Sequence, residues 1–543
     1  MIFSMSMALL WDAWHRPENV STTIPSAQTL PTQTVNMPSN DNIPALKLGV
    51  GTQSAGVVNT QQTKQPNQKI SVKTDFLAAE INTLGGELSQ IKFLQQRDAK
   101  DRNKPFVLLQ KGDEHTYVAQ SGLLGTNLPT HNSMFMAQTS EYVLSEGKNT
   151  LEVRLVSQTQ GNIFVTKTYT FYRGSYLIDV GYDIENKSKS IISPAAYFQL
   201  IRDKSVPDGG SVFVPTYTGS AIYTEADKFQ KIDFSDIEKG KAKLPSAIDN
   251  GWIGMLQHYF VAAWLPKGKV EREFYSKQLE GGLFSAGVIL PVGNIEPGQS
   301  TKISVPLYAG PAQTSLDKIA PGLGLTVDYG WLTIFSIPLF SLLTFLYGWV
   351  SNWGVAIILL TVLIKIVFFP LSAASYKSMG KMRVVAPKLE KIKQQFGNDR
   401  ERLHKATMEL YKTEKINPLG GCLPVLIQIP IFIALYWAIL ASVELRYAPF
   451  LGWITDLSVA DPYYVLPVVM GISMVIQGKL NPVPPDPFQA KLMQIMPIAF
   501  SIVFFFFPAG LVLYSIVNNI LSIAQQWYIT RNIETASKGV AKT

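Results

Sequence analysis

The sequence predicts a polytopic α-helical membrane protein with six spans and a large all-β domain. Three observations lead to this fold class: residues 70–320 alternate between apolar and polar side chains, residues 329–530 are dominated by apolar runs, and a basic loop interrupts those runs. Alternation with a period of two is typical of strands, and apolar runs of about 20 residues are typical of membrane-spanning helices. The 543-residue chain is therefore expected to have one soluble part and one membrane part.

The N-terminal residues are expected to form a membrane anchor followed by a linker. Residues 1–14 are mostly apolar, but as a helix they would span only about 21 Å, less than the hydrocarbon core of a bilayer. They lack the basic start and the small-residue cleavage site of a signal peptide. Residues 1–16 are therefore interpreted as an uncleaved anchor whose first turns are missing from the sequence. Residues 17–68 are rich in Ser, Thr, Gln, Asn and Pro, which favours a flexible linker.

Residues 69–320 are predicted to form an antiparallel β-sandwich. Apolar and other side chains alternate along residues 176–185, and the same pattern follows the turn signal Gly161-Asn162. Many short strands with Gly, Asn and Pro turns favour a sandwich of about 250 residues. His115, His131 and His258 are isolated, and the sequence singles out no paired carboxylates and no Ser/His/Asp arrangement. No catalytic residue is predicted.

The uncharged stretch 329–364 is too long for one span, because its 36 residues would form a helix of about 54 Å. It is either two spans, or an interfacial helix at 329–350 followed by one span at 352–371. With one anchor before it and the β domain outside, only a single span places the following basic loop inside. The interfacial helix is therefore favoured.

The loop at 372–418 is predicted to be a cytoplasmic helical hairpin. Eleven Lys and Arg lie between Lys377 and Lys415 against five acids, which indicates the cytoplasmic side, with RNA contact as a lesser alternative. Apolar residues at heptad spacing from Met382 to Phe396 predict its first helix. The hairpin is either a structural spacer or a docking element for a ribosome or targeting factor. The candidate docking residues are Lys381, Arg383, Lys388, Lys391, Lys393, Arg400 and Arg402.

Four further spans are predicted at residues 423–442, 462–479, 491–507 and 511–530, with a tail at 531–543. Together with the anchor and the span at 352–371 they make six crossings, with both termini inside. Cys422 is the single cysteine, which excludes a disulfide within the chain and a Cys-based metal cluster. No cofactor or metal is predicted.

Lys365 is the candidate functional residue because it is a cation within an apolar run. Ionisable residues inside spans usually face a bundle interior or a wet cavity, and no acidic residue lies within a predicted span to pair with it. Other polar residues at membrane depth are Thr361, Gln428, Tyr514, Ser515 and Asn518, with Asn519, Ser522, Gln525 and Gln526 continuing the strip on the last span. They either join helices by hydrogen bonds or line a groove that receives the polar tail of another polypeptide.

Four stretches resemble the YidC/Oxa/Alb family of membrane protein insertases. They are KINPLGGCLPVLIQIPIF at 415–432, SVELR at 442–446, DPYY at 461–464 and FPAGLVLY at 507–514. Tyr329-Gly330-Trp331, Gly85-Gly86 and Gly251-Trp252 fit as well. The resemblance covers essentially the whole chain, and the Asn-Pro-Leu-Gly-Gly-Cys stretch is specific.

The resemblance implies a β-supersandwich in the periplasm, a five-helix insertase core in the bacterial inner membrane, and a groove open to the cytoplasm and to lipid. The implied activity is non-enzymatic insertion and chaperoning of membrane proteins, alone or with the Sec translocon. The implied partners are nascent membrane proteins, the ribosome, the signal recognition particle pathway and membrane lipids, with no specific nucleic-acid sequence.

By position, Lys365 matches the groove cation of the family, which is most often Arg; lysine keeps the charge but lacks the planar fork. Gln428 and Thr361 match groove-lining positions, and Tyr514 is present, whereas Ser515 stands where relatives often carry a second aromatic residue. The short N-terminus also departs from the family. Two other functions stay open: a membrane-anchored protein whose β domain binds or processes carbohydrate, and a transporter.

Overall fold

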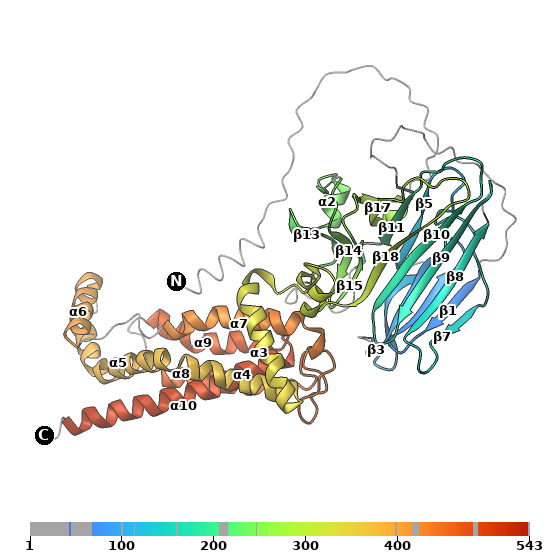
Figure 1. The fold of residues 1–543 in the computed structure, drawn as a ribbon. Helices are drawn as coiled ribbons and strands as arrows, with labels where there is room; N and C mark the ends of the chain where they lie inside the picture. The colour runs from blue at the N-terminus through green and yellow to red at the C-terminus, as the bar shows by residue number, and fades with distance from the viewer. Residues whose placement is uncertain are drawn as a thin grey trace, which may run out of the picture. The chain divides into compact units, whose positions relative to one another are not determined.

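The computed structural model describes residues 43–44, 68–98, 101–112, 115–158, 161–205, 216–245, 247–396, 399–414, 423–481 and 487–540. The predicted anchor at 1–16 and nearly all of the predicted linker at 17–68 lie outside these residues. Within them, strands occupy the N-terminal half and helices the C-terminal half, as the sequence patterns predict (Figure 1).

Two nine-stranded sheets form the β domain. The strands are β1 (Lys69–Lys73), β2 (Leu77–Asn82), β3 (Glu87–Arg97), β4 (Pro105–Lys111), β5 (Thr116–Leu124), β6 (Met136–Ala137), β7 (Glu141–Val143), β8 (Thr150–Gln158), β9 (Ile163–Tyr172), β10 (Leu177–Asn186), β11 (Ala195–Arg202), β12 (Gly219–Thr224), β13 (Lys228–Ile232), β14 (Trp252–Gln257), β15 (Phe260–Trp264), β16 (Glu273–Gln278), β17 (Phe284–Pro291) and β18 (Ser300–Pro311). The first sheet has the order β16-β17-β11-β5-β4-β3-β2-β1-β7 and the second the order β13-β12-β14-β15-β18-β10-β9-β8-β6. A short helix, α2 (Phe234–Glu238), follows β13.

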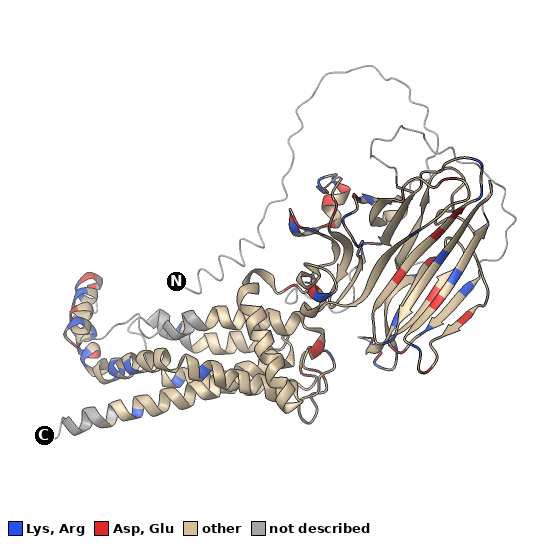
Figure 2. Cartoon of the chain, viewed as in Figure 1, with Lys and Arg blue, Asp and Glu red and all other residues tan. Residues whose placement is uncertain are grey.

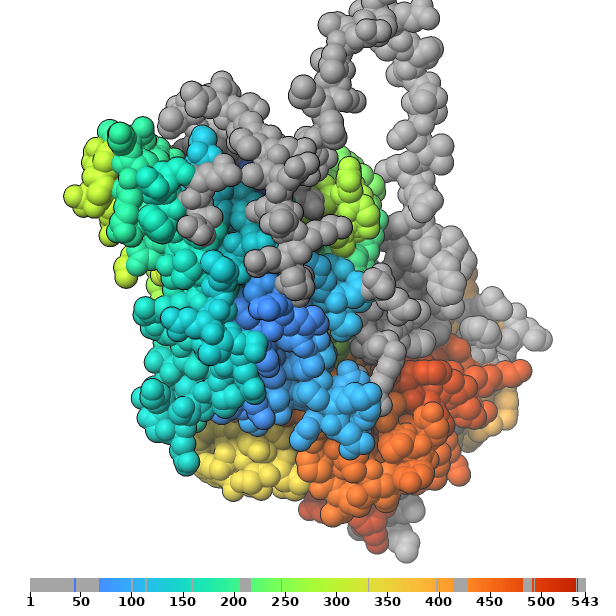
Figure 3. Space-filling model, turned by 90° about the vertical axis from the view of Figure 1, so that its right-hand side faces the viewer, coloured from blue at the N-terminus to red at the C-terminus, as the bar shows by residue number. Residues whose placement is uncertain are grey.

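The predicted antiparallel sandwich is confirmed, with one exception. All the pairs of named strands are antiparallel except β1 and β7, which run parallel. Along β9 and β10 every second residue is buried, and Val180 lies opposite Tyr169 across the pair. Residues of both sheets share one hydrophobic core, and Figure 3 shows the side where β1–β3 (blue) lie beside β8–β9 (teal). Side-chain alternation therefore sets which face of each strand enters the core.

One charged residue, Lys167 on β9, lies on the inward face of the sandwich. Its side chain is fully buried, and its Nζ donates to the carbonyl oxygens of Gly85 at 3.0 Å and Gly86 at 2.9 Å. The rings of Tyr169 and Tyr182 lie 5.3 and 5.5 Å from Nζ, so cation–π attraction adds to the hydrogen bonds. Burial lowers the pKa of Lys167 to about 7, and the Glu87 carboxylate opposes that shift. The lysine thus ties β9 to the turn between β2 and β3.

Gly85 is required at that turn by both conformation and space. Its φ is +73°, and a Cβ atom there would lie 2.0 Å from the carbonyl oxygen of His131. We expect Gly85→Ala to lower the free energy of unfolding by about 2 kcal/mol or more, since left-handed strain and a backbone clash combine. The measurement is urea unfolding of the full-length protein, followed by circular dichroism of the strands.

Gly147→Ala is the matched control for Gly85→Ala. Gly147 has a similar φ of +79°, but no atom lies within 4 Å of the Cβ position. It should therefore lose only about 1 kcal/mol, the cost of the left-handed backbone. Equal losses in the two variants would show that the clash at Gly85 relaxes freely.

The second half of the described chain is helical. Its helices are α3 (Thr333–Val350), α4 (Trp353–Val367), α5 (Phe369–Phe396), α6 (Arg400–Thr413), α7 (Leu423–Ala441), α8 (Val465–Leu480), α9 (Pro487–Phe504) and α10 (Ala509–Val540). Short 3₁₀ turns occur at Glu280–Gly282, Thr314–Lys318, Leu323–Thr326, Gly330–Leu332 and Val443–Leu445. Helix α10 packs against α4, α5, α7 and α8, while α3 packs against α4 and α7. Charged residues are sparse on α3, α4 and α7 and frequent on α5, α6 and the strands (Figure 2).

By length and composition, α3 is the one helix of the described residues that could cross a membrane alone. Helices α4 and α5 pass the same test together, but they meet at an angle of 67°. The apolar segments Gln428–Ala441, Val465–Leu480 and Gln494–Phe504 are shorter. The interfacial role of residues 329–350 and the count of six spans stay predictions.

Helix boundaries agree with the sequence at some junctions and differ at two. Asn352 separates α3 from α4, as its breaker position predicts, because its Oδ1 accepts a hydrogen bond from the Val355 amide at 3.1 Å. The helix expected to continue to residue 371 ends at Val367, since Pro370 removes an amide donor and crowds the preceding turn. Helix α10 continues past the expected end at residue 530 to Val540.

Helices α5 and α6 form a hairpin in the predicted loop. Val385 and Tyr411 pack together between the two helices, and Lys388 bonds Glu414 at 2.6 Å. Asp399 caps α6 by accepting from the amides of residues 401 and 402. Met382 and Val385 of the heptad pattern belong to this packing face, and residues 397–398 of the expected turn lie outside the described part.

Candidate functional site

Helix α4 places Lys365 in an apolar setting and aims it at α10. The side chain is 8% exposed, and Nζ donates to Ser522 Oγ at 2.7 Å. That hydroxyl in turn donates to the carbonyl oxygen of Asn518, 2.7 Å away. No carboxylate in the described part of the chain forms an ion pair with Lys365. The cation is therefore held by one neutral hydroxyl and keeps donor capacity for another group.

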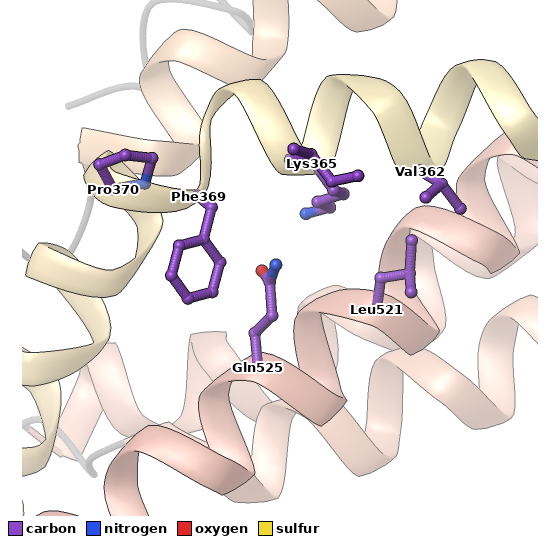
Figure 4. A pocket seen from close by; sticks show the side chains of 7 residues that line it. Val362, Lys365, Phe369, Pro370, Leu521 and Gln525 are labelled. Atoms are coloured by element: carbon purple, nitrogen blue, oxygen red, sulfur yellow. The ribbon is translucent and has the colours of Figure 1, made fainter.

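A cavity of about 410 Å³ opens beside Lys365. It lies where α4 bends into α5 and faces one side of α10 (Figure 4). Its lining residues are Val362, Lys365, Ile366, Phe369, Pro370, Leu521 and Gln525. Lys365 and Gln525 are the polar members of this set, and Figure 4 shows them pointing toward each other across the cavity. The break before Pro370 thus creates space next to the buried charge.

The other predicted groove residues do not line this cavity. The Thr361 hydroxyl donates to Ile357 O and the Ser515 hydroxyl to Leu511 O, so each is bonded to its own helix. Tyr514 is 1% exposed and packs against Phe432 of α7, with ring centroids 6.3 Å apart. Gln428 is half-buried, one turn before Phe432. Asn518 joins the Lys365 site through its backbone carbonyl.

Two members of the polar strip on α10 act as links between helices. Asn519 donates to Ser473 Oγ of α8 at 2.9 Å. Gln526 donates to Leu480 O and to Asn481 Oδ1, each at 3.0 Å. The sequence leaves open whether this strip joins helices or lines a groove; in the structure Asn519 and Gln526 join helices, and Gln525 lines the cavity beside Lys365. Ser473 was missed because a single serine in an apolar helix carries no signal of its partner.

The histidines of the β domain do not form a catalytic arrangement with one another. His131 Nδ1 lies 2.6 Å from Tyr197 OH, and His115 Nδ1 lies 2.8 Å from an Asp203 carboxylate oxygen. Burial lowers the pKa of both His131 and His258 to about 4, so these two are neutral at physiological pH. Among the described residues, no group of three or more His, Cys, Asp or Glu is placed to hold a metal ion.

Comparison with known families accounts for nearly the whole chain. Residues 69–342 match the model of the YidC periplasmic domain, and residues 345–537 match the model of the 60Kd inner membrane protein family. The chain belongs to the YidC family of membrane protein insertases. It is 52% identical to membrane protein insertase YidC of Nitrosospira multiformis, over 100% of this chain and 98% of that protein. The YidC of Aromatoleum aromaticum is 50% identical, over 99% of this chain and 98% of that protein.

A crystal structure of an active YidC insertase is also similar to this chain. It is 21% identical, with a TM-score of 0.41, and the match covers 86% of this chain and 93% of that one. The family is one of insertases and not of catalytic enzymes. The fold therefore combines a β domain of two sheets with the helical region of an insertase.

Proposed function

We propose that this chain inserts hydrophobic segments of newly made proteins into the bacterial inner membrane, and serves as a membrane chaperone, alone or with the Sec translocon. A groove between α4 and α10 with one positive charge would receive the segment. The observation that carries the proposal is the buried Lys365 ammonium, which faces a cavity and has no carboxylate partner among the described residues. Family membership supports the same function.

The proposed mechanism lowers the cost of moving polar groups into hydrocarbon. An unpaired backbone or side-chain polar group costs several kcal/mol there. Lys365 offers a charge to an acidic group of the incoming tail, while Val362, Ile366 and Phe369 contact the apolar part of the segment. The segment then moves sideways into lipid. No covalent bond forms or breaks, so the gain comes from the attraction of Lys365 for the tail and from solvation.

The proposed topology follows the family and the charge pattern. The match of residues 69–342 to a periplasmic domain supports a periplasmic β domain. The basic hairpin of α5 and α6 is then cytoplasmic, with six spans and both termini on the cytoplasmic side. The length and apolar composition of α3 allow a crossing as well as an interfacial position, so its placement in the membrane is part of this proposal.

We further propose that the hairpin receives the ribosome or the signal recognition particle pathway, and that it also contacts anionic lipid. Lys381, Lys391, Lys393 and Arg402 are exposed on it, which supports an electrostatic contact that does not depend on a nucleic-acid sequence. Arg383 instead donates to Lys479 O of α8, and Lys388 pairs with Glu414, so these two also serve the packing of helices. Nothing in the described residues favours the carbohydrate or transporter alternatives.

The proposed function is tested by crosslinking to a nascent chain. A photoreactive residue at position 428 or 514 should crosslink to the hydrophobic segment of a stalled membrane-protein chain, because position 514 belongs to α10, which borders the proposed groove, and position 428 belongs to α7, which packs against α10. Position 334 of α3 is the control, since Ile334 is 77% exposed and lies on another helix. Crosslinks from 334 as strong as those from 428 and 514 would contradict a groove-based route.

A further inference from the structure

The cavity beside Lys365 holds a second polar group whose bonding capacity is unused. Gln525 reaches the cavity from α10, and its Oε1 is buried without a hydrogen-bond partner among the described residues. The next residue, Gln526, also has a buried Oε1 without a partner among the described residues, but its amide nitrogen is bonded twice to the end of α8 and it does not line the cavity. Two glutamines that are neighbours in sequence therefore differ in role, because one links helices and the other faces the cavity (Figure 4).

An amide oxygen without a partner at membrane depth is costly, and that of Gln525 belongs to a residue that lines a cavity large enough for a ligand. Burying a polar group without a partner costs roughly 1–3 kcal/mol on mutational scales. The same cavity presents the Lys365 ammonium, which has three N–H donors and, among the described residues, one partner, Ser522 Oγ at 2.7 Å. One wall thus offers a charged donor, and the opposite wall offers an amide whose oxygen has no partner in the described part of the chain.

We propose that Lys365 and Gln525 together bind the side-chain amides of an incoming polypeptide tail, so that the site accepts neutral polar tails as well as acidic ones. This inference rests on the proposed insertase function and adds a ligand class to it. The carboxamide of an Asn or Gln side chain carries a carbonyl oxygen that accepts hydrogen bonds and an NH₂ group that donates them. Its C=O can accept from Lys365 Nζ while one of its N–H groups donates to Gln525 Oε1.

Carboxylates and amides would use the two residues differently. A carboxylate only accepts hydrogen bonds, so it pairs with Lys365 by charge and gains little from the Gln525 oxygen. An amide is neutral and gains less from Lys365, so the second hydrogen bond from Gln525 matters more. The remaining lining residues are apolar, which leaves these two side chains to distinguish one polar tail from another.

The test compares two single-span substrates in proteoliposomes containing the full-length protein. Their translocated tails are identical except that every Asp and Glu of the first is Asn or Gln in the second. Gln525→Met keeps side-chain length and removes the amide. We expect it to slow insertion of the amide tail by about three- to tenfold, the value of one hydrogen bond, and to leave the acidic tail nearly unchanged.

Gln526→Met is the matched control, because it removes an amide that joins α10 to the end of α8 and does not line the cavity. Any effect of it should be the same for both tails. Equal slowing of both tails by Gln525→Met, or no effect on either, would overturn the amide-binding inference while leaving the insertase function intact. Failure of the unsubstituted protein to insert either tail would instead count against the proposed function, and with it the inference.

Crosslinking keeps the inference testable where Gln525→Met does not accumulate in the membrane. A photoreactive residue at position 525 should crosslink to the amide tail, whereas one at position 527 should not, because Trp527 is 52% exposed and is absent from the cavity lining. Equal crosslinking from both positions would overturn the inference.

Discussion

Lys365→Glu should slow insertion of a substrate with an acidic tail by about tenfold or more, whereas Lys365→Arg should keep most of the activity. Two unit charges about 4 Å apart interact by roughly 4 kcal/mol near a protein surface, and the substitution turns that attraction into repulsion. Water in the groove weakens both the attraction and the repulsion, so a tenfold effect, or about 1.4 kcal/mol, is a lower bound. Arginine keeps the positive charge, although its planar guanidinium group is larger than an ammonium group.

The measurement is insertion into proteoliposomes with purified protein and a substrate that needs no ribosome, so that the hairpin plays no part. Lys491→Glu makes the same change of charge at an exposed position of α9 and should insert normally. A substrate whose tail carries no acidic residue should lose much less than the acidic one. If the lysine, arginine and glutamate proteins insert the acidic substrate equally, the charge of the groove has no role in insertion.

The strands and most helices were predictable because their signals are local. Alternation along residues 163–186 identifies β9 and β10 and the faces they bury, since the period of a strand equals the period of the pattern. Apolar runs identify α7 and α8 within a few residues. Helix α10 is longer than the expected span because residues beyond 530 are charged yet still compatible with a helix in water.

The site was predictable in its charge and not in its shape. Lys365 is evident from sequence, since a cation in an apolar run is rare. The cavity depends on the bend between α4 and α5, for which Pro370 was the available signal. The different contacts of Gln525 and Gln526 depend on where α8 ends next to α10, and this is set by tertiary packing, not by local sequence. A polar strip therefore indicates a site but cannot show which members have partners.

Lys167 shows the same limit inside the β domain. The alternation of β9 places it on the inward face with Val165 and Tyr169, so its burial follows from pattern alone. What makes that burial tolerable is the pair of carbonyls at Gly85 and Gly86, more than 80 residues earlier. Pairing over such a distance has no local signature, and sequence reasoning had assigned Lys167 no role.

The buried Lys167 should make the β domain more stable as pH rises from 7 to 9. Its pKa is about 7 in the folded protein and near 10.5 when unfolded, so between those values the unfolded chain binds more protons. The contribution of Lys167 to the free energy of unfolding therefore falls as pH drops from about 10.5 to about 7, and it changes no further below the folded pKa. The expected gain between pH 7 and pH 9 is about 2 kcal/mol.

Lys167→Met should abolish that dependence on pH, whatever it does to stability at a single pH. The variant removes the titrating group and leaves the Gly85 carbonyl without its donor, so its net effect at pH 7 combines a relieved desolvation cost with a lost hydrogen bond. The measurement is hydrogen exchange of the β9 amides in the full-length protein. Comparing the variant with the unsubstituted protein at each pH removes the intrinsic exchange rate, which is the same in both. His131 does not contribute to the change in stability between pH 7 and 9, because its pKa of about 4 in the folded protein places its effect below pH 7. If both proteins gain stability equally between pH 7 and 9, another group titrates there and the Lys167 ammonium is not the one that loses its proton.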